Sequence, residues 1–210
     1  MTQPQANQPR ALALACSLKP SSESSSSDLL ARQILDALAE HGVRGSSVRV
    51  ADHVIPPGVG HEMSDDDAWP AIREEVLASD VLLLCTPIWL GHPSSLAQRV
   101  LERLNADLSE TGEDGRPIMF DKVAVVGIVG NEDGAHKVTA DLFQGLADLG
   151  FTVPAHGSAY WVGEARGGTD YQDLDEMPAG LEGNISNLAR NAAHLAGLLS
   201  RTPYPAPPSD

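Results

Sequence analysis

The chain has 210 residues, of which 42% are hydrophobic, and it carries a formal net charge of -15 at pH 7. This length suits a single domain with a sizeable core, and no apolar run approaches the roughly 18 residues of a membrane span. The negative charge argues against nucleic acid and anionic membranes as partners, because both bind clusters of Lys and Arg. Two cysteines are too few for a disulfide framework, so we expect a reducing, cytoplasmic setting.

Predicted strands and helices alternate along the chain. Apolar or alternating runs predict strands at residues 11–17, 46–52, 81–85 and 122–129, and a fifth that begins at 151–153 and resumes near 159–162. Apolar residues at helical spacing predict helices at 25–40, 68–78, 94–108, 135–149 and 181–200. Strict alternation predicts an α/β fold in which helices cover both faces of a parallel sheet. We take residues 11–200 as one domain and expect flexible tails at 1–10 and 201–210.

The loop after the first strand has the features of an anion site. It runs from Ser17 to Ser27 and leads into a helix, whose free N–H groups favour an anion. The residues that could hold the anion are Ser17, Lys19, Ser25, Ser26 and Ser27. The loop has no glycine, so it is neither a GxGxxG nor a Walker A motif. We interpret it as a site for a terminal phosphate; the alternative is a serine-rich linker with an ordinary helix cap.

The loops after the third and fourth predicted strands should lie beside the first loop, because ligands of such folds bind where the strands end. The third strand is followed by Thr86, Pro87, Ile88, Trp89, Leu90 and Gly91. A proline turn, an aromatic side chain and open main-chain groups can hold a flat ring, although Trp89 alone is more typical of a core or an interface. The fourth strand is followed by Gly130, Asn131, Glu132, Asp133, Gly134 and, after Ala135, His136. Asn131 and Asp133 are alternatively helix caps, and the spacing of acidic and histidine residues does not support a metal site, so we predict none.

These three loops carry a family resemblance. The serine-rich loop, CTPIWLGHPSS and VGNEDGAH resemble the flavodoxin-like NAD(P)H-dependent oxidoreductases, which include NADPH-dependent FMN reductases and WrbA-type quinone reductases. GSAYWVGEARGGTDY is similar to one subgroup, and the resemblance extends over residues 11–199. It implies a flavodoxin-like doubly wound sheet of five parallel strands in the order 2-1-3-4-5, a homodimer or homotetramer, and bound FMN.

Under this resemblance the first loop would hold the FMN phosphate, the second would meet the isoalloxazine ring, and the third would close the other side of the ring, with His136 nearby. Two departures from the family pattern stand out. The first loop lacks the usual glycine and has Lys19 where arginine is common, and Ile88-Trp89 replaces the arginine–aromatic pair of WrbA-type enzymes. A WrbA-like substrate preference is therefore not expected.

The function expected from these residues is an enzymatic one. NADPH or NADH would reduce FMN, which would pass two electrons to a quinone, flavin, azo or nitro compound. His136 and Tyr160 are the candidate proton donors. The alternative is a non-catalytic, flavodoxin-type electron carrier for a basic redox partner, which the acidic composition favours. Trp89, His92 and the segment 161–177 favour the enzyme, because they provide material for a covered substrate pocket.

Two other functions that this topology supports lack their residues. A phosphoacceptor domain needs acidic residues where the first and third strands end, and those places hold Cys16-Ser17 and Cys85-Thr86. A serine hydrolase needs a G-x-S-x-G elbow after a strand, which the sequence does not contain. We interpret Cys16 and Cys85 as small buried residues, in preference to a redox pair.

Overall fold

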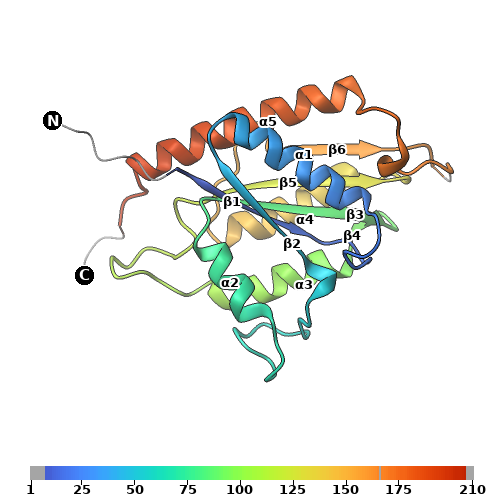
Figure 1. The fold of residues 1–210 in the computed structure, drawn as a ribbon. Helices are drawn as coiled ribbons and strands as arrows, with labels where there is room; N and C mark the ends of the chain where they lie inside the picture. The colour runs from blue at the N-terminus through green and yellow to red at the C-terminus, as the bar shows by residue number, and fades with distance from the viewer. Residues whose placement is uncertain (1–7, 166, 207–210) are drawn as a thin grey trace.

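The structure is a computed structural model, and it describes residues 8–165 and 167–206 (Figure 1). The strands are β1 (Arg10–Ala15), β2 (Arg44–Arg49), β3 (Val81–Trp89), β4 (His92–Pro93), β5 (Val123–Gly130) and β6 (Ser158–Val162). The α-helices are α1 (Ser26–Glu40), α2 (Trp69–Leu77), α3 (Ser95–Leu104), α4 (Ala135–Asp148) and α5 (Ala179–Arg201). The 3-10 helices are η1 (Val50–Asp52), η2 (Asn105–Asp107) and η3 (Tyr171–Asp173).

The sheet has the strand order β2-β1-β3-β5-β6, and every pair along this path is parallel. The predicted flavodoxin-like order 2-1-3-4-5 is therefore confirmed for the parallel strands. The short strand β4 is an addition that the sequence did not indicate. It pairs antiparallel with β3 through Ile88↔Pro93 and Trp89↔His92, and two prolines made this stretch look like a loop, because proline cannot donate to a strand ladder.

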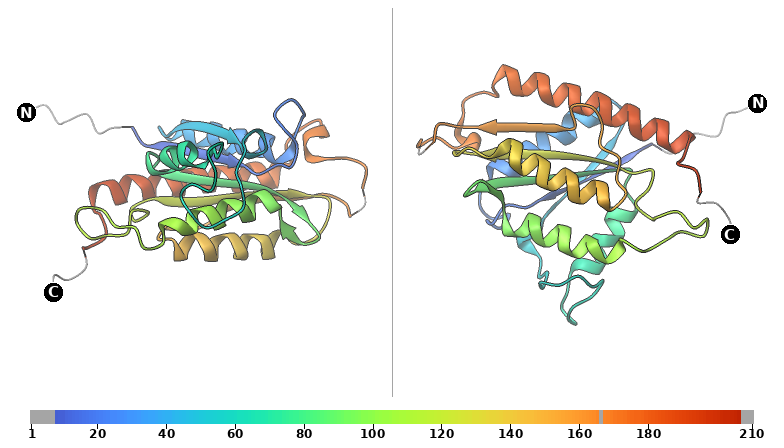
Figure 2. Two further views of the ribbon diagram at one scale, coloured as in Figure 1. Left: turned by 90° about the horizontal axis from the view of Figure 1, so that it is seen from below. Right: turned by 180° about the vertical axis from the view of Figure 1, so that it is seen from behind.

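Helices cover both faces of the sheet, as Figures 1 and 2 show: α1 and α5 lie on one face, and α2, α3 and α4 on the other. Side chains alternate between the two faces along each strand. Cys16 accordingly belongs to the core under α2–α4 and Cys85 to the core under α1 and α5. Both are free and buried, and burial raises the pKa of both thiols. The interpretation of small buried residues is confirmed.

Several element boundaries differ from the prediction. The fifth strand does not begin at 151–153, where the chain forms only an isolated bridge between Val123 and Thr152; it is β6. The second strand ends at Arg49 because the chain then turns into η1. Of the predicted tails, residues 1–7 and 207–210 lie outside the described residues. Arg10 already belongs to β1, and the ring of Tyr204 packs 5.4 Å from that of Phe120.

Candidate functional site

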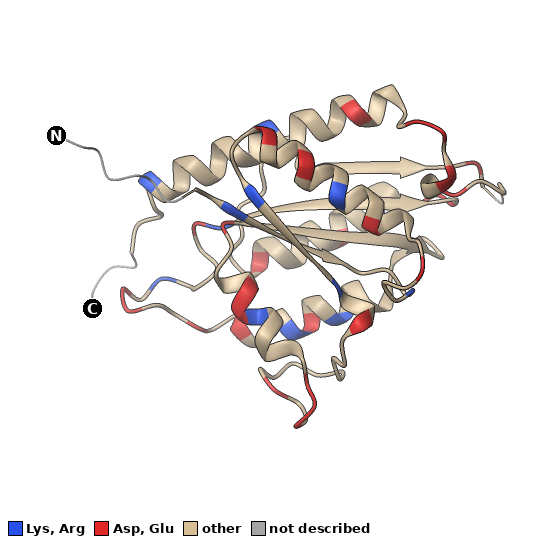
Figure 3. Ribbon diagram, in the orientation of Figure 1, with Lys and Arg blue, Asp and Glu red and all other residues tan. Residues whose placement is uncertain are grey.

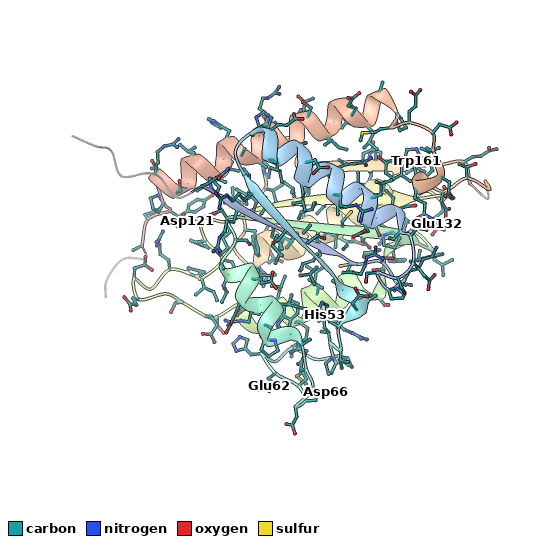
Figure 4. The ribbon with its side chains drawn as sticks, viewed as in Figure 1. His53, Glu62, Asp66, Asp121, Glu132 and Trp161 are labelled. Carbon is teal, nitrogen blue, oxygen red and sulfur yellow. The ribbon has the colours of Figure 1, made fainter. Side chains whose placement is uncertain are left out.

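A cavity of about 630 Å³ lies beyond the carboxyl ends of β1, β3, β5 and β6. Figure 4 shows Glu132 and Trp161 at this end of the sheet and Asp121 at the other. All three predicted loops contribute to the cavity, and so does the segment after β6. The lining residues are Ser17, Leu18, Lys19, Ser25, Ser26, Ser27, Pro87, Ile88, Trp89, Leu90, Val129, Gly130, Asn131, Glu132, Trp161, Ala165, Asp170, Tyr171 and Gln172.

Serine side chains at and before the N-terminus of α1 line part of the cavity. The hydroxyl oxygen of Ser17 accepts the Lys19 N–H at 3.1 Å, and that of Ser26 accepts the Gln172 N–H at 3.3 Å. Ser25 is the N-cap of α1, and its oxygen accepts the Asp28 N–H at 3.4 Å. Because a hydroxyl has one proton and two lone pairs, these contacts leave the protons of Ser17 and Ser26 available to an anion. The donor set therefore fits a phosphate group.

Aromatic side chains also line the cavity. Trp161 lies with its ring centre 5.4 Å from that of Tyr171, at an interplanar angle of 45°. Tyr171 is 2% exposed, and its hydroxyl donates to the Gln33 side chain at 2.6 Å. Burial raises the pKa of this phenol, so it stays protonated near neutral pH. Trp89 is 56% exposed and stands at the opening of the cavity.

The segment after β6 is fastened over the cavity by side chains of the other loops. Asn131 Nδ2 donates to Asp170 Oδ1 at 2.8 Å. This side chain therefore holds the segment after β6 to the loop after β5, and it does not cap α4. The contacts of Ser26 with Gln172 and of Gln33 with Tyr171 fasten the same segment to α1. Sequence reasoning placed segment 161–177 over the pocket without naming its lining residues, which are Trp161, Ala165, Asp170, Tyr171 and Gln172. It also missed Leu18 and Val129, which belong to a loop and a strand that it did identify.

Other predicted site residues surround the cavity without lining it; they are Thr86, Gly91, Asp133, Gly134, His136 and Tyr160. Thr86 is buried, and its hydroxyl oxygen accepts the Ser94 N–H at 3.0 Å, which ties β3 to the start of α3. His136 Nε2 lies 2.9 Å from the Tyr160 hydroxyl. Tyr160 and Trp161 are neighbours on β6 and point to opposite faces of the sheet, so Tyr160 packs on the α4 side. A proton-transfer role for His136 and Tyr160 stays a prediction.

The charges around the cavity are mostly acidic. Figure 3 shows Asp and Glu gathered in the segment between β6 and α5. Among the described lining residues, Lys19 is the only Lys, Arg or His, whereas Glu132 and Asp170 are carboxylates. A phosphate bound here would therefore depend on hydroxyl groups, main-chain N–H groups and the α1 dipole as well as on Lys19.

Residues 9–165 match the family model described as NADPH-dependent FMN reductase. The chain belongs to this family. It is 31% identical over 205 residues to the 8-demethyl-8-aminoriboflavin-5'-phosphate synthase of Streptomyces davaonensis, covering 93% of this chain and 80% of that protein. A crystal structure of RosB with a bound 8-demethyl-8-formylriboflavin-5'-phosphate intermediate has 31% identity and a TM-score of 0.82, and the match covers 93% of this chain and 82% of RosB. The family resemblance inferred from the three loops is confirmed: this is a flavin-binding oxidoreductase family that uses NAD(P)H.

The chain is also similar to part of a transporter and to a flavodoxin. The chain is 37% identical over 209 residues to the divalent metal cation transporter MntH of Mycobacterium bovis, which covers 95% of this chain but only 30% of the transporter. None of the described helices is long and apolar enough to cross a membrane. A flavodoxin from the domain Archaea has a TM-score of 0.59 at 8% identity, covering 90% of this chain and 99% of the flavodoxin, so it shares the fold alone.

Proposed function

We propose that this protein binds FMN in the cavity and catalyses two-electron transfer from NADPH or NADH to a small acceptor, such as a quinone, flavin, azo or nitro compound. The observation that carries the proposal is the lining of the cavity, which combines hydroxyl groups at the start of α1 with the aromatic side chains of Trp89, Trp161 and Tyr171. FMN carries both of the groups that such a lining would bind, a phosphate and an aromatic ring.

The proposal assigns separate roles to FMN and to the residues that line the cavity. Bound FMN would supply the redox chemistry, by accepting hydride from the nicotinamide and returning two electrons to the acceptor. Ser17, Ser26 and Lys19 would hold the phosphate, and main-chain groups of Pro87–Leu90 and Gly130–Glu132 would meet the edge of the ring. The exposed side of the cavity beside Trp89 would admit the nicotinamide and the acceptor in turn.

A second candidate function is modification of the flavin itself. It is favoured by the 31% identity to a protein named as a flavin phosphate synthase, 80% of whose length the chain covers, and by the flavin phosphate intermediate bound in the RosB structure. In this case a flavin phosphate would occupy the same cavity as a substrate. A third candidate, the electron carrier, has the acidic charge of the chain in its favour.

One series of measurements separates these candidates. The purified protein is loaded with FMN, and NADPH or NADH is added without oxygen, followed by a benzoquinone. Rapid two-electron bleaching and reoxidation, with FMN recovered at its original mass, supports the oxidoreductase. A change in the mass of the recovered flavin in aerobic incubations supports the modifying enzyme. Reduction by dithionite in one-electron steps, with no response to either nicotinamide, overturns the proposal and supports the carrier.

A further inference from the structure

The loop that would hold the phosphate is fixed by hydrogen bonds to residues outside the loop. It contains no glycine, and its main-chain groups are held by residues at the end of β2 and in η1. Arg49 Nη1 donates to the carbonyl oxygens of Lys19 and Pro20 at 3.0 and 3.3 Å. Asp52 accepts the Ser21 N–H at 2.8 Å, and this hydrogen bond holds the pKa of Asp52 below its usual value.

Arg49 is also the buried partner of a carboxylate beside the proposed phosphate site. Its side chain is 7% exposed, and Nη2 lies 2.9 Å from Asp28 Oδ2. Asp28 is in the first turn of α1, next to Ser27 of the cavity. Its other partner, Arg32, is 56% exposed and therefore more strongly screened by solvent. Without Arg49, a phosphate at the start of α1 would face a poorly neutralised carboxylate.

We propose that Arg49 is a positioning residue that gives this site its affinity for the phosphate of a flavin, by holding the loop carbonyls away from the phosphate and by neutralising Asp28. This proposal rests on the proposed function, because it assumes that a flavin phosphate binds at Ser17–Ser27. Arg49 does not line the cavity, so it acts through the loop and through charge.

The proposal is tested by comparing FMN with riboflavin, which lacks the phosphate. In Arg49→Gln we expect FMN affinity to fall by about 10- to 100-fold, because charged hydrogen bonds and neutralisation are lost, and riboflavin affinity to change less than about threefold. Adding Asp28→Asn to Arg49→Gln should restore part of the FMN affinity, because it removes the carboxylate that Arg49 neutralised. Arg44→Gln is the matched control: it changes an exposed arginine at the other end of the same strand and should leave both affinities unchanged.

Equal losses of FMN and riboflavin affinity, or no loss of either, would overturn the proposal. If Arg49→Gln does not fold, Arg49→Lys serves instead: it keeps the charge but cannot reach two carbonyls and a carboxylate together, so it should lose FMN affinity selectively and to a smaller extent. Failure of the wild-type protein to bind FMN or riboflavin would instead contradict the proposed function. The affinities are measured by quenching of flavin fluorescence, with thermal unfolding as the check on folding.

Discussion

Gly134 lies directly against Gly91: a Cβ on Gly134 would stand 2.8 Å from the Cα of Gly91. This contact joins the turn between β5 and α4 to the hairpin between β3 and β4, and both segments have residues in the wall of the cavity. Gly134 has a φ of 132° and Gly91 a φ of 73°, and residues other than glycine rarely adopt such backbone conformations. Two loops from strands that are neighbours in the sheet are thus held at a separation that only glycine permits.

Gly134→Ala should therefore destabilise the fold by about 1–3 kcal/mol, because the new methyl group meets backbone that cannot rotate away. We also expect weaker FMN binding, since the hairpin that carries Trp89 must shift. Gly145→Ala is the control, within the helix α4 that follows Gly134. A Cβ at position 145 would lie 3.5 Å from the Leu101 side chain, an ordinary van der Waals distance. Alanine should therefore raise the free energy of unfolding by about 0.5–1 kcal/mol there. Urea unfolding gives the free energy of unfolding of both variants. Equal values for the two variants would contradict the prediction.

Leu90 carries backbone strain at the opening of the cavity. It has φ of 53° in the turn between β3 and β4 and is 89% exposed. A left-handed conformation costs about 1–2 kcal/mol for a residue with a Cβ, and less for asparagine or glycine. Leu90→Asn gives the Asn-Gly sequence that such turns favour, so we expect a higher melting temperature. Leu198→Asn, at a 42% exposed helical position, should instead lower it. A lower melting temperature for Leu90→Asn would show that this turn is not strained.

Local sequence patterns were enough to predict the alternating strands and helices and the three loops at the edge of the sheet. They could not decide which of Tyr160 and Trp161 faces the cavity, because a shift of one residue in strand register reverses every side chain. They also gave no indication of the role of Arg49. Its partner Lys19 is 30 residues away in the sequence, and the acceptor is a main-chain carbonyl oxygen, which every residue type has. The acidic stretch at residues 64–67, just before α2, has the composition of a helix cap. Asp67 does accept the Trp69 N–H, but it also forms a buried ion pair with Arg103 that no local pattern predicts.

This buried ion pair should matter for stability. Both side chains are fully buried, with Arg103 Nη2 at 2.7 Å from Asp67 Oδ2. Asp67→Asn leaves the Arg103 charge without its carboxylate, which should cost about 3 kcal/mol. Asp66→Asn is the control, because Asp66 is exposed and bonds only to the Ser64 hydroxyl among the described residues. Denaturant unfolding at neutral pH should separate the two variants, and an effect of Asp67→Asn below 1 kcal/mol would contradict the prediction.

The same pair predicts a pH dependence. Burial raises the pKa of Asp67, but hydrogen bonds from Arg103, Trp69 and Met63 outweigh it and hold this pKa below its usual value. A carboxylate with a lowered folded-state pKa stabilises the fold above its unfolded pKa, about 3.9, and this contribution is lost as the pH falls through the folded value. The stability difference between wild type and Asp67→Asn should therefore be constant near neutral pH and shrink in acid. A difference that grows in acid would contradict this assignment.

Subunit assembly is a further expectation. We propose a homodimer or homotetramer in which Trp89 and the segment after β6 lie at a subunit contact. Trp89 and Leu90 are exposed beside the cavity, and a partner subunit would add a wall on this side while leaving an entrance for the nicotinamide and the acceptor. Sedimentation velocity at micromolar concentration should detect the oligomer, and Trp89→Ser should weaken it. Leu108→Ser, at a 51% exposed position that does not line the cavity, is the control. A monomer with full FMN occupancy would rule out the proposal.

Ser26→Asp tests directly whether a phosphate binds at the start of α1. Ser26 lines the cavity and is the first residue of α1. A carboxylate in the first turn of a helix interacts favourably with the helix dipole, so the stability of the apoprotein should be unchanged or slightly higher. A phosphate bound there would instead face a like charge about 4 Å away, a repulsion on the order of 4 kcal/mol near a protein surface. We expect FMN affinity to fall by at least about 100-fold and riboflavin affinity to fall much less.

Ser24→Asp is the control: Ser24 is exposed in the same loop and does not line the cavity, so FMN affinity should change only a few-fold. Unchanged FMN affinity in Ser26→Asp would remove this loop from the flavin site.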